Sequence, residues 1–299
     1  MKKQIFKGLC TAIITPFSDG EIDYTSFKLI LEKQMQAGID AVVVLGTTGE
    51  PCTITEKERE KIIKNAVAIC KGKIKVIVGC GSNNTNNAIK YYNQAERLGV
   101  DGALIVTPYY NKCTQDGIVA HYSQIASTGS LPIIVYNVPS RTGFNIDVST
   151  LKELTKINNI CGIKEASGNI NQLLEYFRCV GNEISIYCGD DSLNYVYSAL
   201  GASGYISVLS NIMPKVTKRI FNMCEDGKYF DANALQLKLL PLINKLFVKV
   251  NPIPVKSALN YLGLCKNELR LPLTVLPDYD FEQLKYEIDR VWKLENDCL

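Results

Sequence analysis

The sequence has 299 residues, of which 46% are apolar, and its formal net charge at pH 7 is +3, which suits one large domain or two small ones. The balanced charge excludes the dense Lys and Arg patch of a nucleic-acid or membrane-surface binder, and no stretch approaches the roughly 20 apolar residues of a membrane span. The N-terminal residues resemble a signal peptide only faintly, because Pro16, Asp19 and Glu21 follow at once, so we expect a soluble, cytoplasmic protein.

Short apolar runs rich in β-branched residues recur along the chain and predict strands. In chain order they begin at Gly8, Ala41, Lys75, Gly102, Pro132, Ile160, Ser185 and Gly204. Amphipathic stretches at helical spacing separate them, and the stretches 26–38, 56–72 and 86–99 each end on a glycine, the preferred residue after a helix. The runs are continuously apolar rather than alternating, which is typical of strands covered on both faces.

Repeated strand–helix units of this kind predict an α/β fold, a closed (β/α)8 TIM barrel. A doubly wound open sheet is the structural alternative, but no G-x-G-x-x-G follows the first strand. The repeat ends near Glu225, so we assign residues 1–226 to the barrel with its active site and 227–299 to a C-terminal helical extension. Helical patterns cover 229–250, 252–264 and 280–296, and we expect the extension to pack on the barrel or on a partner subunit.

The cysteines and the histidine restrict the chemistry. The 11 cysteines form no C-x-x-C pair and several lie inside apolar runs, a pattern that favours reduced, packed thiols over a disulfide framework or a zinc site. The single histidine, His121, lies in a helical pattern without a catalytic role. We therefore expect no metal centre and no Ser-His-Asp relay.

A barrel brings the carboxyl ends of its strands to one face, where such folds carry their chemistry. The residues that follow the predicted strands therefore form the candidate site. They are Thr47, Thr48 and Glu50 in GTTGE, Tyr109 and Tyr110 in TPYYN, Tyr136 and Arg141 in YNVPSRTG, Lys164 in GIKEASG, and Gly189, Asp190 and Asp191 in CGDD.

Lys164 is the most informative of these residues because it ends a buried apolar strand. Desolvation favours the neutral amine, which is the form that attacks a carbonyl carbon to make an imine. A structural ion pair is the alternative; Glu165 is poorly placed for it because adjacent strand residues point to opposite faces, whereas Asp190 or Asp191 are available. Both interpretations stay open on the residues alone.

Three other features of the rim fit a small acidic substrate. GTTGE offers backbone N–H groups and two hydroxyls for a carboxylate, although a plain strand–helix turn has the same pattern. Arg141 is suited to bind a second carboxylate, and an ordinary surface arginine is the alternative. Tyr136 and Tyr110 are suited to transfer protons, whereas most isolated tyrosines are packing residues.

The motifs GTTGE, TPYYN, YNVPSRTG, GIKEASG and CGDD, in this order and spacing, resemble those of the dihydrodipicolinate synthase family, pyruvate-dependent barrels of the class I aldolase type. The similarity extends over nearly the full length. The resemblance implies a lyase, without metal or cofactor, that condenses pyruvate with L-aspartate 4-semialdehyde through a Schiff base on Lys164. That reaction is the entry step of diaminopimelate and lysine biosynthesis.

The resemblance also implies a proton relay and an oligomer. Tyr136 lies beside the imine, and Thr47 links its hydroxyl to Tyr110, which reaches in from a neighbouring subunit. A tyrosine shared in this way implies at least a homodimer, and the family commonly forms a tetramer of two dimers.

By the same resemblance, Thr48 and the adjacent backbone hold the carboxylate of pyruvate, Arg141 binds that of the semialdehyde, and Gly189 and Ile206 line the pocket. Two alternatives remain: a lyase for sialic acid or 2-keto-3-deoxy sugar acids, which usually differs at Arg141, and a non-catalytic ligand-binding barrel. The intact set of site residues argues against the second.

One part of the family pattern is altered in this sequence. Many members are inhibited by lysine at a cleft between subunits; Asn83 and Tyr109 match that site, but Asn87 occupies the acidic position and Arg59 stands where a histidine is common. Losing the acid removes the partner of the lysine ammonium, and Arg59 adds repulsion. We therefore predict weak or absent inhibition by lysine.

Overall fold

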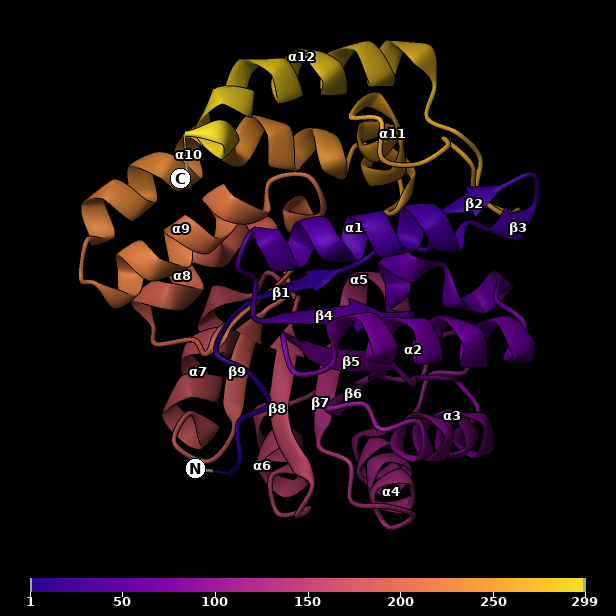
Figure 1. Cartoon of the computed structure of the whole chain (residues 1–299). Helices are drawn as coiled ribbons and strands as arrows, with labels where there is room; N and C mark the ends of the chain where they lie inside the picture. The colour runs from indigo at the N-terminus through magenta and orange to yellow at the C-terminus, as the bar shows by residue number, and fades with distance from the viewer. Residues whose placement is uncertain (1, 298–299) are drawn as a thin grey trace.

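The computed structural model describes residues 2–297 and contains a closed barrel of parallel strands (Figure 1). Its strands are β1 Gly8–Ala12, β4 Ala41–Val44, β5 Lys75–Gly79, β6 Gly102–Val106, β7 Ile133–Asn137, β8 Ile160–Glu165, β9 Ser185–Cys188 and β10 Gly204–Ser207. The barrel closes because β1 pairs with β10 on one side and with β4 on the other. Each predicted strand is present, and the predicted (β/α)8 barrel is confirmed.

Helices follow the strands and surround the barrel. They are α1 Tyr24–Gln36, α2 Glu56–Cys70, α3 Thr85–Arg97, α4 Gln115–Ala126, α5 Pro139–Thr142, α6 Val148–Leu154, α7 Ile170–Val180, α8 Asn194–Ala199 and α9 Pro214–Glu225. The first three end before Gly38, Gly72 and Gly99, whose φ angles of 73°, 74° and 75° are left-handed, as the sequence predicts. A small hairpin of β2 (Phe17–Ser18) and β3 (Glu21–Ile22) was not predicted, because strands of two residues leave no pattern.

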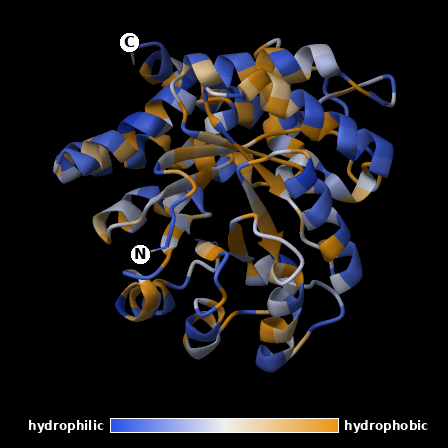
Figure 2. Ribbon diagram, turned by 60° about the horizontal axis from the view of Figure 1, so that its bottom comes forward, coloured by the Kyte–Doolittle hydropathy of each residue, from blue (hydrophilic) through white to orange (hydrophobic). Residues whose placement is uncertain are grey.

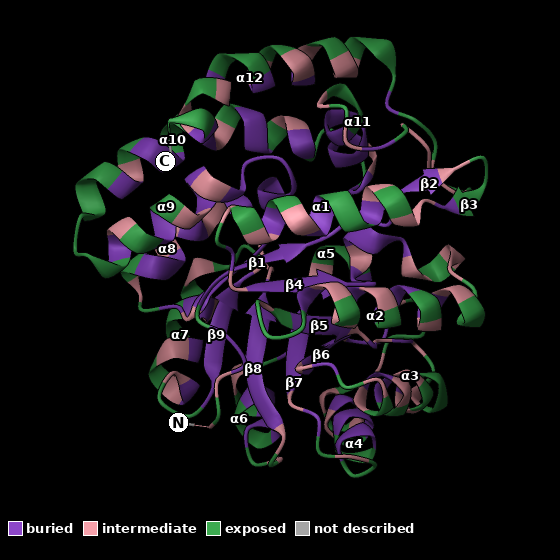
Figure 3. Cartoon of the chain, viewed as in Figure 1, coloured by how far each residue is buried: buried purple, intermediate pink, exposed green. Residues whose placement is uncertain are grey.

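The apolar core has two layers, one between strands and helices and one inside the barrel. The strands are coloured as hydrophobic in Figure 2 and as buried in Figure 3, whereas the outer faces of the helices are polar and exposed. Inside the barrel, Tyr136 packs in the same cluster as Cys10, Leu104, Tyr187 and Ile206. This filling leaves space only at the ends of the barrel.

The C-terminal helices α10 (Tyr229–Leu246), α11 (Ile253–Tyr261) and α12 (Asp278–Asn296) agree with the three predicted helical stretches (Figure 1). Helix α10 packs against α8 and α9, α12 packs against α9 and α10, and α11 packs against α10 and α12. The carboxylate of Glu295 accepts the backbone N–H groups of Lys215 and Val216 at 3.0 and 2.9 Å, in the first turn of α9. Burial raises the pKa of Glu295 to about 7. The division of the chain between residues 226 and 227 stays a prediction.

The cysteines of the described residues are free thiols, as the sequence predicts. Ten cysteines within residues 2–297 are unpaired and seven of them are buried, whereas Cys298 lies outside the described residues. His121 lies on α4 next to the Thr85 hydroxyl, 3.0 Å from its Nδ1, and burial lowers its pKa to about 4. Among residues 2–297, no group of three His, Cys, Asp or Glu side chains is arranged to hold a metal, and no helix is long and apolar enough to span a membrane.

Candidate active site

A cavity of about 380 Å³ opens at the carboxyl ends of the barrel strands. Its walls include seven of the residues that the sequence predicts for the site, namely Thr47, Thr48, Tyr136, Arg141, Lys164, Gly189 and Asp190. These residues lie at the carboxyl ends of four different strands or just after them, so they meet only because the barrel closes. The polar groups gather over an apolar floor, as in most small-molecule sites.

Lys164 lies near the end of β8 and is only 5% exposed. It stands directly opposite Tyr136 in the neighbouring strand β7, so both side chains point to the same side of the sheet. The ammonium Nζ lies 4.3 Å from the centroid of the Tyr136 ring. The amine therefore lies against an aromatic face and in the wall of the cavity.

The acids near Lys164 bind other groups. The Glu165 carboxylate accepts hydrogen bonds from the side-chain amide of Asn137 and from the backbone N–H of Ser167. Burial raises the pKa of Glu165. Asp191 accepts the backbone N–H groups at Val208 and Leu209, both at 2.8 Å, and Asp190 accepts from Ser192 in a short turn. Within residues 2–297, Lys164 has no carboxylate partner, so the structural ion pair that the sequence left open is not formed.

Gly189, directly after β9, leaves room for the lysine side chain. A Cβ atom at this position would lie 2.9 Å from Lys164 Cε and 3.0 Å from the carbonyl oxygen of Glu165. Any larger residue would displace the amine or the strand. The glycine is therefore required by the close approach of Lys164, and not by an unusual backbone angle.

The GTTGE segment forms a tight turn, η1 (Thr47–Gly49), between β4 and α2. Leu45 and Glu50, on either side of it, have left-handed φ angles of 55° and 53°, which are rare for residues with side chains. Such strained positions persist only where the surroundings hold them, and they concentrate at functional sites. The turn brings the Thr48 side chain into the cavity wall.

Arg141 comes from the short helix α5, which follows β7, and lines the cavity. Its Nη2 donates to the backbone carbonyl of Asn251 at 3.3 Å. No carboxylate within residues 2–297 pairs with the guanidinium, so its remaining donors are available to an acidic ligand.

Tyr110 and Ile206, to which the family resemblance gives roles in the site, do not line this cavity. Tyr110 is 92% exposed, with a left-handed φ of 71°, and is not part of the cavity wall of its own chain. Its entry into the site of a neighbouring subunit stays a prediction. Ile206 is buried in the barrel interior beside Tyr136 and does not reach the cavity surface.

The residues that match the family's lysine cleft lie at another part of the surface. Asn83 and Tyr109 are half-buried and Asn87 is exposed. Arg59 is buried and donates to the carbonyl of Gly79 at 2.7 Å, and its repulsion of a bound lysine stays a prediction. Burial also lowers the pKa of Arg59.

The C-terminal helices contribute cavity residues that the sequence did not reveal. They are Ile243, Asn244, Phe247 and Asn251, joined by Ser140 and Ser192 from the barrel loops. No short-range pattern marks these residues, because the contacts that bring Asn251 to Thr48 join positions 203 residues apart. The C-terminal extension is thus part of the site.

Comparison with known proteins agrees with this geometry. The sequence profile described as the Dihydrodipicolinate synthetase family matches residues 5–290. The chain belongs to this family. The match includes the barrel, its rim motifs and most of the C-terminal helices.

Individual members of the family are similar to this chain over nearly its whole length. The 4-hydroxy-tetrahydrodipicolinate synthase of Alkaliphilus oremlandii is 46% identical, over 96% of this chain and 99% of its own. A dihydrodipicolinate synthase from Acinetobacter baumannii, solved in complex with pyruvate, is 38% identical with a TM-score of 0.94, over 96% and 99% of the two chains. A monomeric dihydrodipicolinate synthase variant is 41% identical with a TM-score of 0.94, over 96% and 97%.

Proposed function

We propose that the protein is a 4-hydroxy-tetrahydrodipicolinate synthase that condenses pyruvate with L-aspartate 4-semialdehyde. The observation that carries this proposal is Lys164, a buried amine without an acidic partner at the mouth of a (β/α)8 barrel. Family membership and the names of the full-length relatives give the substrates.

The first step uses the amine as nucleophile. Lys164 Nζ attacks the keto carbon of pyruvate, water leaves, and the imine forms. Loss of a proton from the pyruvate methyl group then gives an enamine. The Tyr136 hydroxyl transfers protons in these steps, since its ring lies 4.3 Å from the amine.

The second step joins the substrates. The enamine carbon adds to the aldehyde carbon of the semialdehyde, whose amino group then attacks the imine carbon. This attack closes the ring and releases Lys164 as the free amine, so the lysine is regenerated. Imine formation loses one water, and the product is 4-hydroxy-tetrahydrodipicolinate.

Two groups of the cavity bind the two carboxylates. Thr48, with the adjacent N–H groups of the η1 turn, holds the carboxylate of pyruvate, and Arg141 holds that of the semialdehyde. Gly189 leaves the space that the imine needs beside Lys164. The cavity volume of about 380 Å³ suits two small acids.

The proton relay involves a second subunit in this proposal. Thr47 links Tyr136 to Tyr110 of a neighbouring chain, and the exposed Tyr110 ring is the surface feature that supports it. The active form is then a homodimer or a tetramer of two dimers, in the cytoplasm. Sedimentation of the purified protein tests this, and a fully active monomer would contradict it.

Borohydride reduction in the presence of pyruvate is the direct test of the function. An intact mass increased by one reduced pyruvyl group, located at Lys164 by peptide mapping, is the expected result. The Lys164→Ala variant is the control and forms no adduct. A coupled assay that shows cleavage of sialic acid or sugar acids, and no turnover of aspartate semialdehyde, would contradict the proposed substrate.

Inhibition by lysine is expected to be weak or absent. Asn87 supplies no negative charge for the lysine ammonium, and the buried Arg59 fills the space beneath Tyr91 at 4.3 Å from its ring centroid. The measurement is the initial rate of the purified enzyme at millimolar lysine. A strong fall in rate would show that the cleft binds lysine without the acid.

A further inference from the structure

Asn251 joins the two groups to which the proposed function gives the substrate carboxylates. It lies in the link between α10 and α11, is 5% exposed and lines the cavity. Its side-chain Nδ2 donates to the Thr48 hydroxyl at 2.9 Å, and its backbone carbonyl accepts from Arg141 at 3.3 Å. One residue of the C-terminal segment therefore contacts both binding groups through two different parts.

The contact with Thr48 fixes which way the hydroxyl can donate. An amide N–H only donates, so the Thr48 oxygen acts as acceptor in this hydrogen bond and keeps its own proton for another partner. Within residues 2–297 the Thr48 hydroxyl makes no other hydrogen bond. Its proton is therefore left for an acceptor that enters the cavity, such as a carboxylate oxygen.

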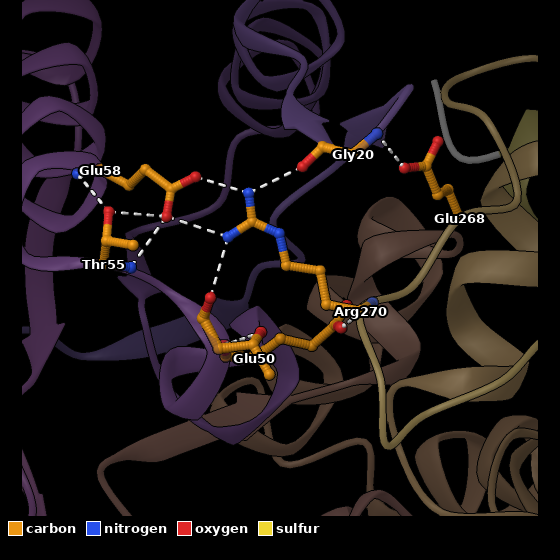
Figure 4. A network of polar contacts seen from close by, with 7 residues as sticks. Gly20, Glu50, Thr55, Glu58, Glu268 and Arg270 are labelled. Atoms are coloured by element: carbon orange, nitrogen blue, oxygen red, sulfur yellow. Dashed lines mark hydrogen bonds and ion pairs between the residues drawn. The ribbon is translucent and has the colours of Figure 1, made fainter.

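The same C-terminal segment holds the other end of the turn. The Lys256 ammonium on α11 pairs with the Glu50 carboxylate at 2.5 Å, and the backbone N–H of Arg270 donates to it at 3.1 Å. Figure 4 shows how Arg270 and Glu50 lie together at this contact. The turn is thus attached to the C-terminal segment at Thr48 and at Glu50, which holds the amide of Asn251 in register with the hydroxyl.

We propose that Asn251 is a positioning residue that orients the Thr48 hydroxyl, so that its proton is donated to the carboxylate of the bound keto acid. The role rests on the proposed function, because it acts on pyruvate binding. Nδ2 makes the contact to Thr48, whereas Oδ1 of the same amide is buried and has no partner within the described residues. The backbone carbonyl holds Arg141 independently of the side chain.

The Asn251→Ala variant separates these two parts. It removes the donor to Thr48 but keeps the backbone carbonyl that Arg141 contacts. The pyruvate concentration that gives half-maximal borohydride trapping is expected to rise about tenfold, the size of a lost hydrogen bond to a charged group. The KM for the semialdehyde should change less than about twofold. A general structural role would raise both values, and that result would overturn the proposal.

A pair of aspartate variants tests the direction of the hydrogen bond. In Asn251→Asp the new carboxylate accepts the Thr48 proton and turns it away from the substrate, so the half-maximal pyruvate concentration should rise further than in Asn251→Ala. Asn244→Asp is the matched control, since it adds a carboxylate to the same cavity without contact to Thr48. Equal effects of the two would mean that charge alone acts, and would overturn the proposal.

The last test combines Asn251→Ala with substitutions of Thr48. With Thr48→Val no hydroxyl remains to be oriented, so adding Asn251→Ala should have little further effect, whereas with Thr48→Ser the tenfold effect should return. Additive effects would overturn the proposal. The unsubstituted enzyme separates this failure from that of the proposed function: if it forms no adduct with pyruvate, the imine chemistry itself is wrong.

Discussion

Two buried lysines, Lys164 in the cavity wall and Lys256 beside Glu50, differ in whether a carboxylate pairs with the ammonium. Lys164 is 5% exposed and has no carboxylate partner among residues 2–297, only the face of Tyr136. Lys256 is fully buried, pairs with Glu50 at 2.5 Å and donates to the carbonyl of Glu268 at 2.9 Å. Burial lowers the pKa of Lys256, and Glu50 opposes that shift.

The difference shows that burial alone does not identify a catalytic lysine. A buried ammonium is costly unless its donors are satisfied, and the surroundings of Lys256 satisfy them. The surroundings of Lys164 do not satisfy its donors, and Lys164 lies in the wall of a cavity that a keto acid can enter. The four experiments below test whether one lysine serves chemistry and the other serves stability.

The largest effect is expected for Lys164→Met. Turnover should fall by more than about 10⁴-fold, because removal of a covalent nucleophile leaves only the binding groups. The free energy of unfolding should stay the same or rise, since an apolar side chain replaces a buried amine without an ionic partner. Steady-state kinetics and urea unfolding measure the two. A variant that unfolds more easily would show that Lys164 also has a structural role.

Lys256→Met should have the opposite effect. It leaves Glu50 buried without its cation, so the free energy of unfolding should fall by about 3–5 kcal/mol. The folded fraction should still form the borohydride adduct on Lys164. Glu50→Gln in the same chain removes the stranded charge, so the double variant should be more stable than the sum of the two single changes predicts. Simple additivity would mean that the two side chains are not coupled.

Tyr136→Phe tests what the ring beside Lys164 contributes. The ring stays, so the packing inside the barrel and the free energy of unfolding should change by less than about 1 kcal/mol. Turnover should fall by about 10²-fold, because the hydroxyl that transfers protons is lost. The pyruvate adduct should still form on Lys164, but more slowly. Unchanged turnover would remove Tyr136 from the mechanism and leave it as a packing residue.

The sequence predicts Lys164 and its strand for a local reason. Eight apolar runs, spaced by helical patterns, determine the barrel, and the barrel determines which residues reach its carboxyl end. The contacts that hold the GTTGE turn have no such local origin, because they join residues far apart in the sequence. Glu50 pairs with Lys256, and the Thr48 hydroxyl accepts from Asn251. Such partners depend on how the C-terminal helices pack, and no spacing in the sequence encodes that.

The smallest effect concerns the ion pair between Glu58 and Arg270, next to the buried pair (Figure 4). Its side chains are 18% and 20% exposed, so solvent screens it, and Glu58→Gln should lower the free energy of unfolding at pH 7 by about 1 kcal/mol. The matched control is Glu56→Gln on the same helix, whose exposed pair with Lys90 should contribute almost nothing.

The pH dependence distinguishes this pair from that of Lys256. Hydrogen bonds from Arg270 lower the pKa of Glu58 from 4.5 to about 2. Because the folded pKa lies below the unfolded one, the contribution of Glu58 is complete above pH 4.5 and is lost as the pH falls toward 2. Urea unfolding between pH 6 and pH 3 should therefore show a weaker pH dependence for Glu58→Gln than for the unsubstituted protein. If the two dependences coincide, Arg270 does not hold Glu58 in its ionised form.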